Sequence, residues 1–158
     1  MIDRIQFNPE TDLKIERIVP ITPMQVYEAW TVPALMVKWF TPAPWKTVAA
    51  EVDARPGGKC EVTMQSPEGE TLPPMTGCVL HADPGKAYIF TSCLMPGFRP
   101  SPEPNFTGAI LIEPAEGGAK YTAIAMHKDS ADRNQHAEMG FEAGWNAALD
   151  QMIAMYSE

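Results

Sequence analysis

The segment from His136 to Tyr156 constrains the fold most, because it has the pattern of a long helix with one strongly apolar side. Large apolar residues recur there at steps of three and four, the spacing that places side chains on one face of an α-helix. They are Phe141, Trp145, Leu149, Met152, Ile153 and Tyr156. We expect one continuous helix that begins at Asp129 or Ser130. The rest of the chain must then supply a broad apolar surface for it to lie on.

Small residues form a second line on the same predicted helix. Gly140, Gly144 and Ala148 follow one another at intervals of four. An interior glycine costs a helix roughly 1 kcal/mol relative to alanine, so two on one line indicate that bulk is unfavourable there. Either another element packs closely against this line, or space is left open beside it. The sequence alone leaves both interpretations open.

Strand patterns fill most of the chain before that helix. Residues 12–19 alternate as a half-buried strand, and residues 47–127 alternate as six more strands in hairpins. In the first hairpin we expect Val48, Ala50 and Val52 to share one apolar face. The strands are separated by segments rich in proline, glycine and acidic residues, at 55–58, 66–69, 83–86 and 114–118.

Two short helices are predicted after the first strand. Thr22 can cap a helix that starts at Pro23, and Gln25 stands where a capping box closes. Pro33 can open a second helix, which ends near Phe40. The predicted order is one strand, two short helices, six antiparallel strands and a long helix. It indicates an α+β fold in which a curved sheet wraps around the terminal helix.

Prolines interrupt the strand pattern at two places. Pro73 and Pro74 cannot donate hydrogen bonds to a sheet, so we expect an edge, a bulge or a loop there. The stretch from Leu94 to Pro104 is too rich in proline for a central strand. We expect it to be an ordered surface loop that could act as a lid.

Composition excludes several classes of protein. Net charge is −8, from 20 acidic and 12 basic residues without a basic cluster, which argues against binding to nucleic acid. No apolar run has the roughly 20 residues of a membrane span. The polar start has no secretion signal, so we expect a cytoplasmic protein. The length of 158 residues fits a single domain, 1–158, with an ordered core of about 12–156.

No residue pattern indicates a metal, a cofactor or a catalytic motif. The three cysteines, Cys60, Cys78 and Cys93, are isolated and lack metal-ligand spacing. No nucleophile elbow and no glycine-rich phosphate loop is present. We therefore expect no cofactor, no metal and no catalytic residue.

The order of elements and several short sequence motifs resemble the START-like (SRPBCC, helix-grip) superfamily. Within it, the chain resembles the family named for the activator of the heat-shock-protein-ninety ATPase. The resemblance spans Asp12 to Tyr156 and rests on the words VYEAWT (26–31), WF (39–40), DARPGGK (53–59), GW (144–145) and LD (149–150), with Pro23, Pro33, Pro42, Met64, Gly69 and Gly77. It implies a cavity between sheet and long helix, used across the superfamily for hydrophobic molecules and only sometimes for catalysis.

Two features depart from that family. Members commonly have an acidic residue a few positions after the glycine of the fourth strand, where this chain has Leu80 and His81. The co-chaperones that name the family have a further domain before this one, whereas about ten residues precede the first strand here. The second departure argues against an ATPase-activating clamp.

Aromatic and other side chains are candidates for the lining of such a cavity. The alternative for each is an ordinary core position. The candidates are Trp39, Phe40, Trp45, Met64, Tyr88, Phe98, Phe106, Tyr121, His127, Phe141 and Trp145.

The last strand bears on both catalysis and self-association. Tyr121 and His127 share one face with small alanines between them, so they could be polar ends of a cavity. Ile124 and Met126 occupy the other face, and their exposure would indicate a homodimer surface.

Three functions follow as hypotheses. The first is binding of a small hydrophobic ligand, such as a lipid, a polyketide or an aromatic molecule, without catalysis. The second is a cyclase-like or hydratase-like enzyme that uses His127 and a tyrosine. The third is a co-chaperone-like protein interaction module with a filled core.

Overall fold

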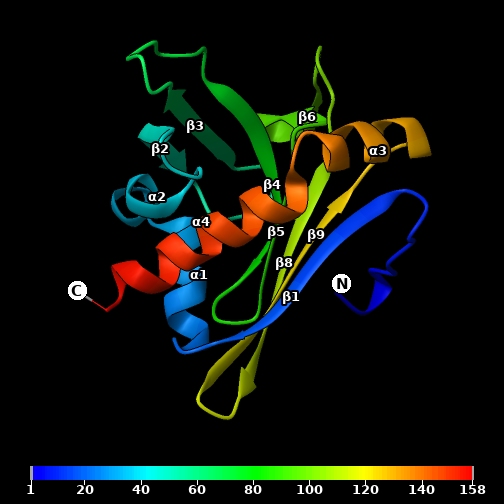
Figure 1. The fold of residues 1–158 in the computed structure, drawn as a ribbon. Coiled ribbons are helices and arrows are strands. Elements are labelled where there is room, and N and C mark those ends of the chain that lie inside the picture. Colours follow the sequence, from blue (N-terminus) through cyan, green and yellow to red (C-terminus); the bar gives the residue numbers. More distant parts are fainter. Residues whose placement is uncertain (1, 158) are drawn as a thin grey trace.

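The computed structural model describes residues 2–157 and shows a curved antiparallel sheet with one helix laid across its concave face (Figure 1). Within that range the main sheet has seven strands in the order β1-β9-β8-β5-β4-β3-β2. This confirms the predicted α+β helix-grip fold, a curved sheet around a C-terminal helix with two short helices after the first strand. The strands of the main sheet are β1 (Asp12–Val19), β2 (Lys46–Val52), β3 (Lys59–Gln65), β4 (Met75–Asp83), β5 (Ala87–Thr91), β8 (Thr107–Ala115) and β9 (Gly118–Met126).

The helices follow the predicted order with one exception. After the short turn η1 (Ile2–Arg4) come α1 (Pro23–Thr31), α2 (Pro33–Trp39), α3 (Ser130–Glu138) and α4 (Phe141–Met155). The capping box that begins α1 is confirmed. The Gln25 N–H donates to Thr22 Oγ1 at 3.1 Å, and the Thr22 N–H donates to Gln25 Oε1 at 2.9 Å.

The prediction of one continuous terminal helix is wrong. The helix begins at Ser130 with Asp129 as its cap, but it breaks after Glu138. Gly140 has φ = 95°, a left-handed conformation that ends α3 and turns the chain into α4. Glycine adopts this conformation without strain. Gly140 therefore allows the break between α3 and α4 and does not lie on a packed helix face. A Cβ at Gly144 would meet only Pro42 Cγ, at 3.6 Å, an ordinary contact distance.

Polar contacts hold α4 to β1 and to the end of α2. Arg17 on β1 forms an ion pair of 2.8 Å with Asp150. The Gln151 side-chain amide donates to the carbonyls of Trp39 and Thr41 at 2.8 and 2.9 Å. The helix therefore bridges the first strand and the end of α2, and its own residues Leu149 and Met152 are buried.

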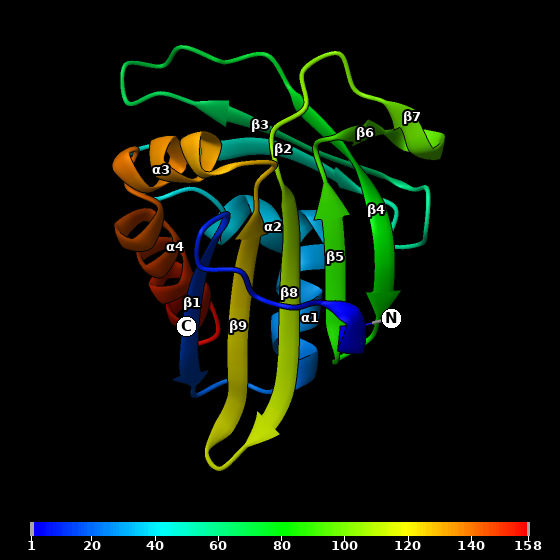
Figure 2. The same cartoon turned by 90° about the vertical axis from the view of Figure 1, so that its right-hand side faces the viewer.

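The convex face of the sheet is covered in part by the N-terminal segment, which crosses β9, β8 and β5 in Figure 2. Ile5 packs there against a small cluster of Ile89, Ala109 and Ile124. Ile124 is only 4% exposed and Met126 is half-buried. The exposure of Ile124 that would have indicated a homodimer surface is therefore absent.

One edge of the sheet, at β2, differs from the simple alternation of the sequence. The register of β2 against β3 shifts between Thr47 and Ala49, so Thr47 is buried and Val48 is 42% exposed. The expected common face of Val48 with Ala50 and Val52 is therefore wrong, because a bulge turns Val48 outward.

The proline-containing stretches have the positions expected of them. Pro73 and Pro74 lie outside any strand, directly before β4. The Leu94–Pro104 stretch is a surface segment that includes a two-stranded hairpin, β6 (Leu94–Met95) with β7 (Arg99–Pro100), around the turn η2 (Pro96–Phe98).

Candidate functional site

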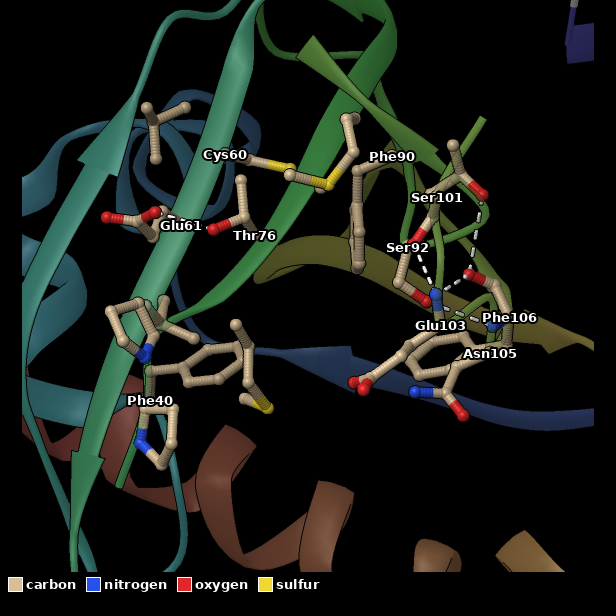
Figure 3. Close-up of a pocket in the computed structure, with 18 of the residues that line it drawn as sticks. Phe40, Cys60, Glu61, Thr76, Phe90, Ser92, Ser101, Glu103, Asn105 and Phe106 are labelled. Carbon is tan, nitrogen blue, oxygen red and sulfur yellow. Dashed lines mark hydrogen bonds between the residues drawn. The ribbon is translucent and has the colours of Figure 1, made fainter. Parts of the chain in front are cut away.

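An open cavity of about 460 Å³ lies between the start of β4 and the segment that leads into β8 (Figure 3). Its inner wall comes from α1, α2 and β5, which contribute Trp30, Met36, Tyr88 and Phe90. One side of the opening is formed by residues 73–77, and the other by residues 101–106. β5 ends at Thr91 while β4 extends further to Met75, so the sheet opens at this point.

Trp30 packs against three other aromatic rings of the cavity wall. Its ring centroid lies 5.6 Å from that of Phe40, 6.1 Å from Tyr88 and 5.5 Å from Phe90. The Trp30 Nε1–H donates to the buried hydroxyl of Tyr121 at 3.1 Å, which fixes the plane of the indole. The cavity thus has a rigid inner surface of packed rings before any ligand arrives.

The polar atoms of the inner wall are neutral at pH 7. Burial raises the pKa of the Cys60 thiol to about 11, and burial raises the pKa of the Tyr88 hydroxyl well above 10. These two side chains influence each other's pKa. Cys60 is therefore a protonated thiol and not a nucleophilic thiolate.

Hydroxyl groups near the opening are already used within the protein. Ser92 Oγ accepts from the Phe106 N–H at 3.1 Å and lies 3.3 Å from the Phe106 carbonyl, to which it donates. Thr91 Oγ1 is 2.9 Å from Thr107 Oγ1. These bonds close the junction between β5 and β8 and leave the hydroxyls little capacity for a ligand.

The charged residues around the cavity are acidic. Figure 3 shows Glu61 on the β3 side and Glu103 on the opposite side. Glu61 accepts from Thr76 Oγ1 at 2.5 Å and lies 3.6 Å from Lys59 Nζ. Glu103 is exposed and, among residues 2–157, forms no ion pair.

Three of the eleven candidate residues line this cavity, namely Phe40, Tyr88 and Phe106. Four others lie in the packed core around it. Trp39 is 2% exposed and donates from Nε1 to the Ala29 carbonyl. Tyr121 is buried behind Trp30, while Phe141 and Trp145 stack on each other with centroids 4.7 Å apart.

The remaining candidates lie away from the cavity. Trp45 is 37% exposed in the loop before β2, and Phe98 is 51% exposed in η2, over Gly57. Met64 accepts a hydrogen bond from Thr41 Oγ1 at its sulfur, on the α2 side of β3. The side chains of Trp45, Met64 and Phe98 are not part of the cavity lining, although Met95 of the 94–100 hairpin is.

His127 belongs to a histidine pair. Its Nδ1 lies 2.9 Å from the Thr11 carbonyl and its Nε2 lies 2.8 Å from His136 Nδ1. A carbonyl only accepts, so His127 Nδ1 bears a proton, and in the neutral pair His136 Nδ1 donates to His127 Nε2. The Phe106 ring packs against both imidazoles, with centroids 5.8 and 5.1 Å away. Both nitrogens of His127 are thus occupied.

Several lining residues have no distinctive signal in the sequence. Trp30 sits on the apolar face of α1 and resembles a core residue. Cys60 and Phe90 belong to ordinary alternating strands, while Glu103 lies in the proline-rich stretch and Asn105 directly follows that stretch. The expectation of a lid at Leu94–Pro104 was the one available signal for Glu103, because residues 101–106 form one side of the opening.

A second hollow, of about 260 Å³, lies where β1 meets α3 and α4. Its lining mixes Lys14 and Arg133 with Asp12 and Glu142, beside Phe7 and Phe141. In residues 2–157 no group of three or more histidine, cysteine or acidic residues is placed to hold a metal ion. None of the helices in that range has the length and apolar character to cross a membrane.

Comparison with known proteins gives consistent matches. The family model of Activator of Hsp90 ATPase homolog 1-like proteins matches residues 20–157. A Nitrosomonas europaea protein of known crystal structure is 36% identical, with a TM-score of 0.91 over 96% of this chain and 97% of that one. No curated protein matches the chain.

More distant structures share the fold. A Rhodobacter sphaeroides protein is 22% identical, with a TM-score of 0.80 over 96% of this chain and 97% of that one. The AHSA1 protein of Silicibacter pomeroyi is also 22% identical, with a TM-score of 0.69 over 92% of this chain and 97% of that one.

Proposed function

Because this chain belongs to the family of Activator of Hsp90 ATPase homolog 1-like proteins, we propose that it uses the cavity of its helix-grip fold to bind a small hydrophobic molecule, without catalysis. The single observation that supports this most is the cavity of about 460 Å³ with Trp30, Phe40, Tyr88, Phe90 and Phe106 in its lining. A volume of several hundred Å³ is typical of small-molecule sites.

Apolar contact alone can supply the binding free energy. Moving apolar surface from water into such a site is favourable by roughly 25 cal/mol per Å², so a preformed cavity binds without a reactive group. The Trp30 rings are held by packing and by the Tyr121 hydrogen bond, so little conformational freedom is lost on binding. Aromatic and fused-ring molecules suit these flat walls best.

The geometry gives less support to the cyclase-like or hydratase-like alternative. That mechanism requires His127 to exchange a proton with a ligand in the cavity. His127 is bonded to Thr11 and His136 instead, and the Phe106 ring packs against the pair. Cys60 and Tyr88, which do face the cavity, keep their protons at neutral pH because burial raises the pKa of each.

Ligand capture tests the proposal directly. The purified protein is analysed by native mass spectrometry, and any bound molecule is extracted and identified. Tryptophan fluorescence is then titrated with fatty acids, sterols and flavonoids, since Trp30 borders the cavity. The control variant is Cys60→Phe, which places a ring where the Cys60 sulfur points into the cavity (Figure 3).

We expect saturable quenching in the wild-type protein and its loss in Cys60→Phe, whose fold is checked by a thermal melt. A ligand-free mass together with no response across the panel would exclude the binding function. Stimulation of an Hsp90-type ATPase by the ligand-free protein would then favour the role that the family description states, which is a protein interaction.

A further inference from the structure

We propose that the cavity selects apolar molecules with a single cationic amine head, and that Glu103 receives that head at the opening. This inference rests on the proposed binding function and defines its ligand class. It follows from where hydrogen-bonding capacity remains free, from the sign of the charges around the opening, and from the aromatic walls. Each of these is a separate observation.

The inner wall offers a ligand almost no hydrogen bonds. The Cys60 thiol and the Tyr88 hydroxyl lie close enough to influence each other, and burial keeps both protonated. Ser92 is bonded twice to the Phe106 backbone, and Thr91 is bonded to Thr107. A polar group placed deep in the cavity would lose its bonds to water without replacement, which is unfavourable. The ligand must therefore place its apolar body inside and its polar head at the opening.

Free polar side chains are concentrated on one side of the opening, in residues 101–105. Glu103 and Asn105 are both exposed there, and neither side chain has a hydrogen bond or ion pair within residues 2–157. A carboxylate only accepts hydrogen bonds, and an amide also has an accepting oxygen. An ammonium group has three donors and no acceptor, so its donors match these oxygens.

The charged residues around the opening disfavour a ligand with an anionic head. No lysine or arginine is among the described residues that line the cavity, where the charged side chains are Glu61 and Glu103. Lys59, the cation beside Glu61, is 3.0 Å from Glu51 and 3.6 Å from Glu61, and is therefore already paired. The net charge of −8 adds a negative background. A fatty-acid carboxylate would meet repulsion and no partner.

The aromatic wall favours the same ligand. The faces of Phe and Trp rings are electron-rich and attract cations within about 6 Å of their centroids. Phe106 lines the cavity, directly follows Asn105 and is three residues after Glu103 in the chain. A protonated amine at the opening thus meets carboxylate, amide oxygen and ring face on one side.

A matched set of three ligands tests the inference by isothermal titration calorimetry at pH 7. The ligands share a naphthyl body and differ in the head: 2-(1-naphthyl)ethylamine, 2-(1-naphthyl)ethanol and 1-naphthylacetic acid. We expect the amine to bind best and the acid worst. Rising salt should reduce the advantage of the amine, because screening weakens an exposed charge pair.

The variant Glu103→Gln isolates the charge. It should weaken binding of the amine about two- to fivefold, the range of an exposed ion pair, and leave binding of the alcohol unchanged. Glu116→Gln removes an equally exposed carboxylate in the β8–β9 turn and should change neither affinity. Both substitutions are at exposed positions, so folding is preserved.

The outcomes separate the inference from the function beneath it. If the alcohol or the acid binds as tightly as the amine, or if Glu103→Gln leaves the amine unaffected, the inference is wrong while the cavity remains a binding site. If no member of this set binds, the inference is wrong too. The proposed function then fails only if no fatty acid, sterol or flavonoid of the panel binds either.

Discussion

Single residues decide how much open space the fold retains, and glycines mark the relevant positions. Gly108 on β8 pairs with Phe90 on β5, and a Cβ at Gly108 would overlap the end of the Phe90 ring. Phe90 is part of the cavity lining. The absence of a side chain at Gly108 therefore lets the ring lie back against the sheet and keeps the cavity open.

Gly108→Ala should push the Phe90 ring away from β8 and into the cavity. We expect a loss of about 1–3 kcal/mol in unfolding free energy, as for other small-to-large changes in packed sites. We also expect weaker binding of every ligand that uses the cavity. Urea denaturation gives the first quantity and calorimetry the second. An unchanged affinity would show that Phe90 does not shape the site.

Gly144→Ala should have the opposite sign. The new Cβ would meet only Pro42 Cγ at 3.6 Å, and alanine favours a helix over glycine by about 1 kcal/mol. We expect the variant to gain about 0.5–1 kcal/mol in a urea melt. Gly140→Ala is the contrast, because φ = 95° there strains any residue with a Cβ and should destabilise the protein. A loss of stability in Gly144→Ala would contradict the open space seen beside α4.

At the scale of elements, sequence periodicity predicts those strands and helix ends that depend only on neighbouring residues in the chain. β1 and the capping box of α1 follow directly from alternation and cap spacing, since neighbours in sequence determine both. The break at Gly140 was not predicted, because Gly140 was interpreted as the first member of a line of small residues on one helix, together with Gly144 and Ala148. The bulge at Thr47 and the N-terminal cover over Ile124 were not predicted either. Each of these depends on contacts between distant segments.

The His127–His136 pair links three such distant segments and should make stability depend on pH. It joins the end of β9 to α3, and through Thr11 to the residue before β1. Burial, and secondarily the neighbouring His127, lower the pKa of His136 below its ordinary value of 6.5. The unfolded chain therefore binds a proton more readily than the folded one in the range just below pH 6.5, so acidification favours unfolding.

We expect the thermal midpoint to fall as the pH is lowered through 6.5 towards 5, and to be flatter in His136→Asn. Asparagine can donate from its amide to His127 Nε2 but does not titrate in this range. Differential scanning calorimetry of both proteins at a series of pH values measures this. Parallel pH profiles for wild type and His136→Asn would show that other groups cause the dependence.

At the scale of the whole molecule, the fold could be predicted but the extent of the site could not. The order of strands and helices implies a sheet wrapped around a helix, and with it an inner face. Which side chains border open space depends on where β5 leaves the sheet and where the 92–106 segment returns. Trp39 and Trp30 have similar sequence environments, yet Trp39 is packed in the core and Trp30 borders the cavity.

The cavity is bordered by two parts of the structure. One part is the β3–β4 edge with α2, and the other is β5 and β8 with the 101–106 segment. A ligand that fills the space contacts both, so it binds the folded state and not the unfolded chain. Binding of this kind stabilises by RT ln(1 + [L]/Kd), which is about 2.7 kcal/mol when the ligand is at one hundred times its Kd.

For a protein of this size, that gain should raise the thermal midpoint by about 5–10 °C. We expect this shift with 2-(1-naphthyl)ethanol at one hundred times the wild-type Kd, and a smaller shift in Gly108→Ala at the same ligand concentration, because the displaced Phe90 ring reduces the available volume. Gly144→Ala, which changes the helix outside the cavity lining, should retain the full shift. An equal shift in all three proteins would place the ligand outside this cavity, for instance in the hollow beside Lys14 and Arg133.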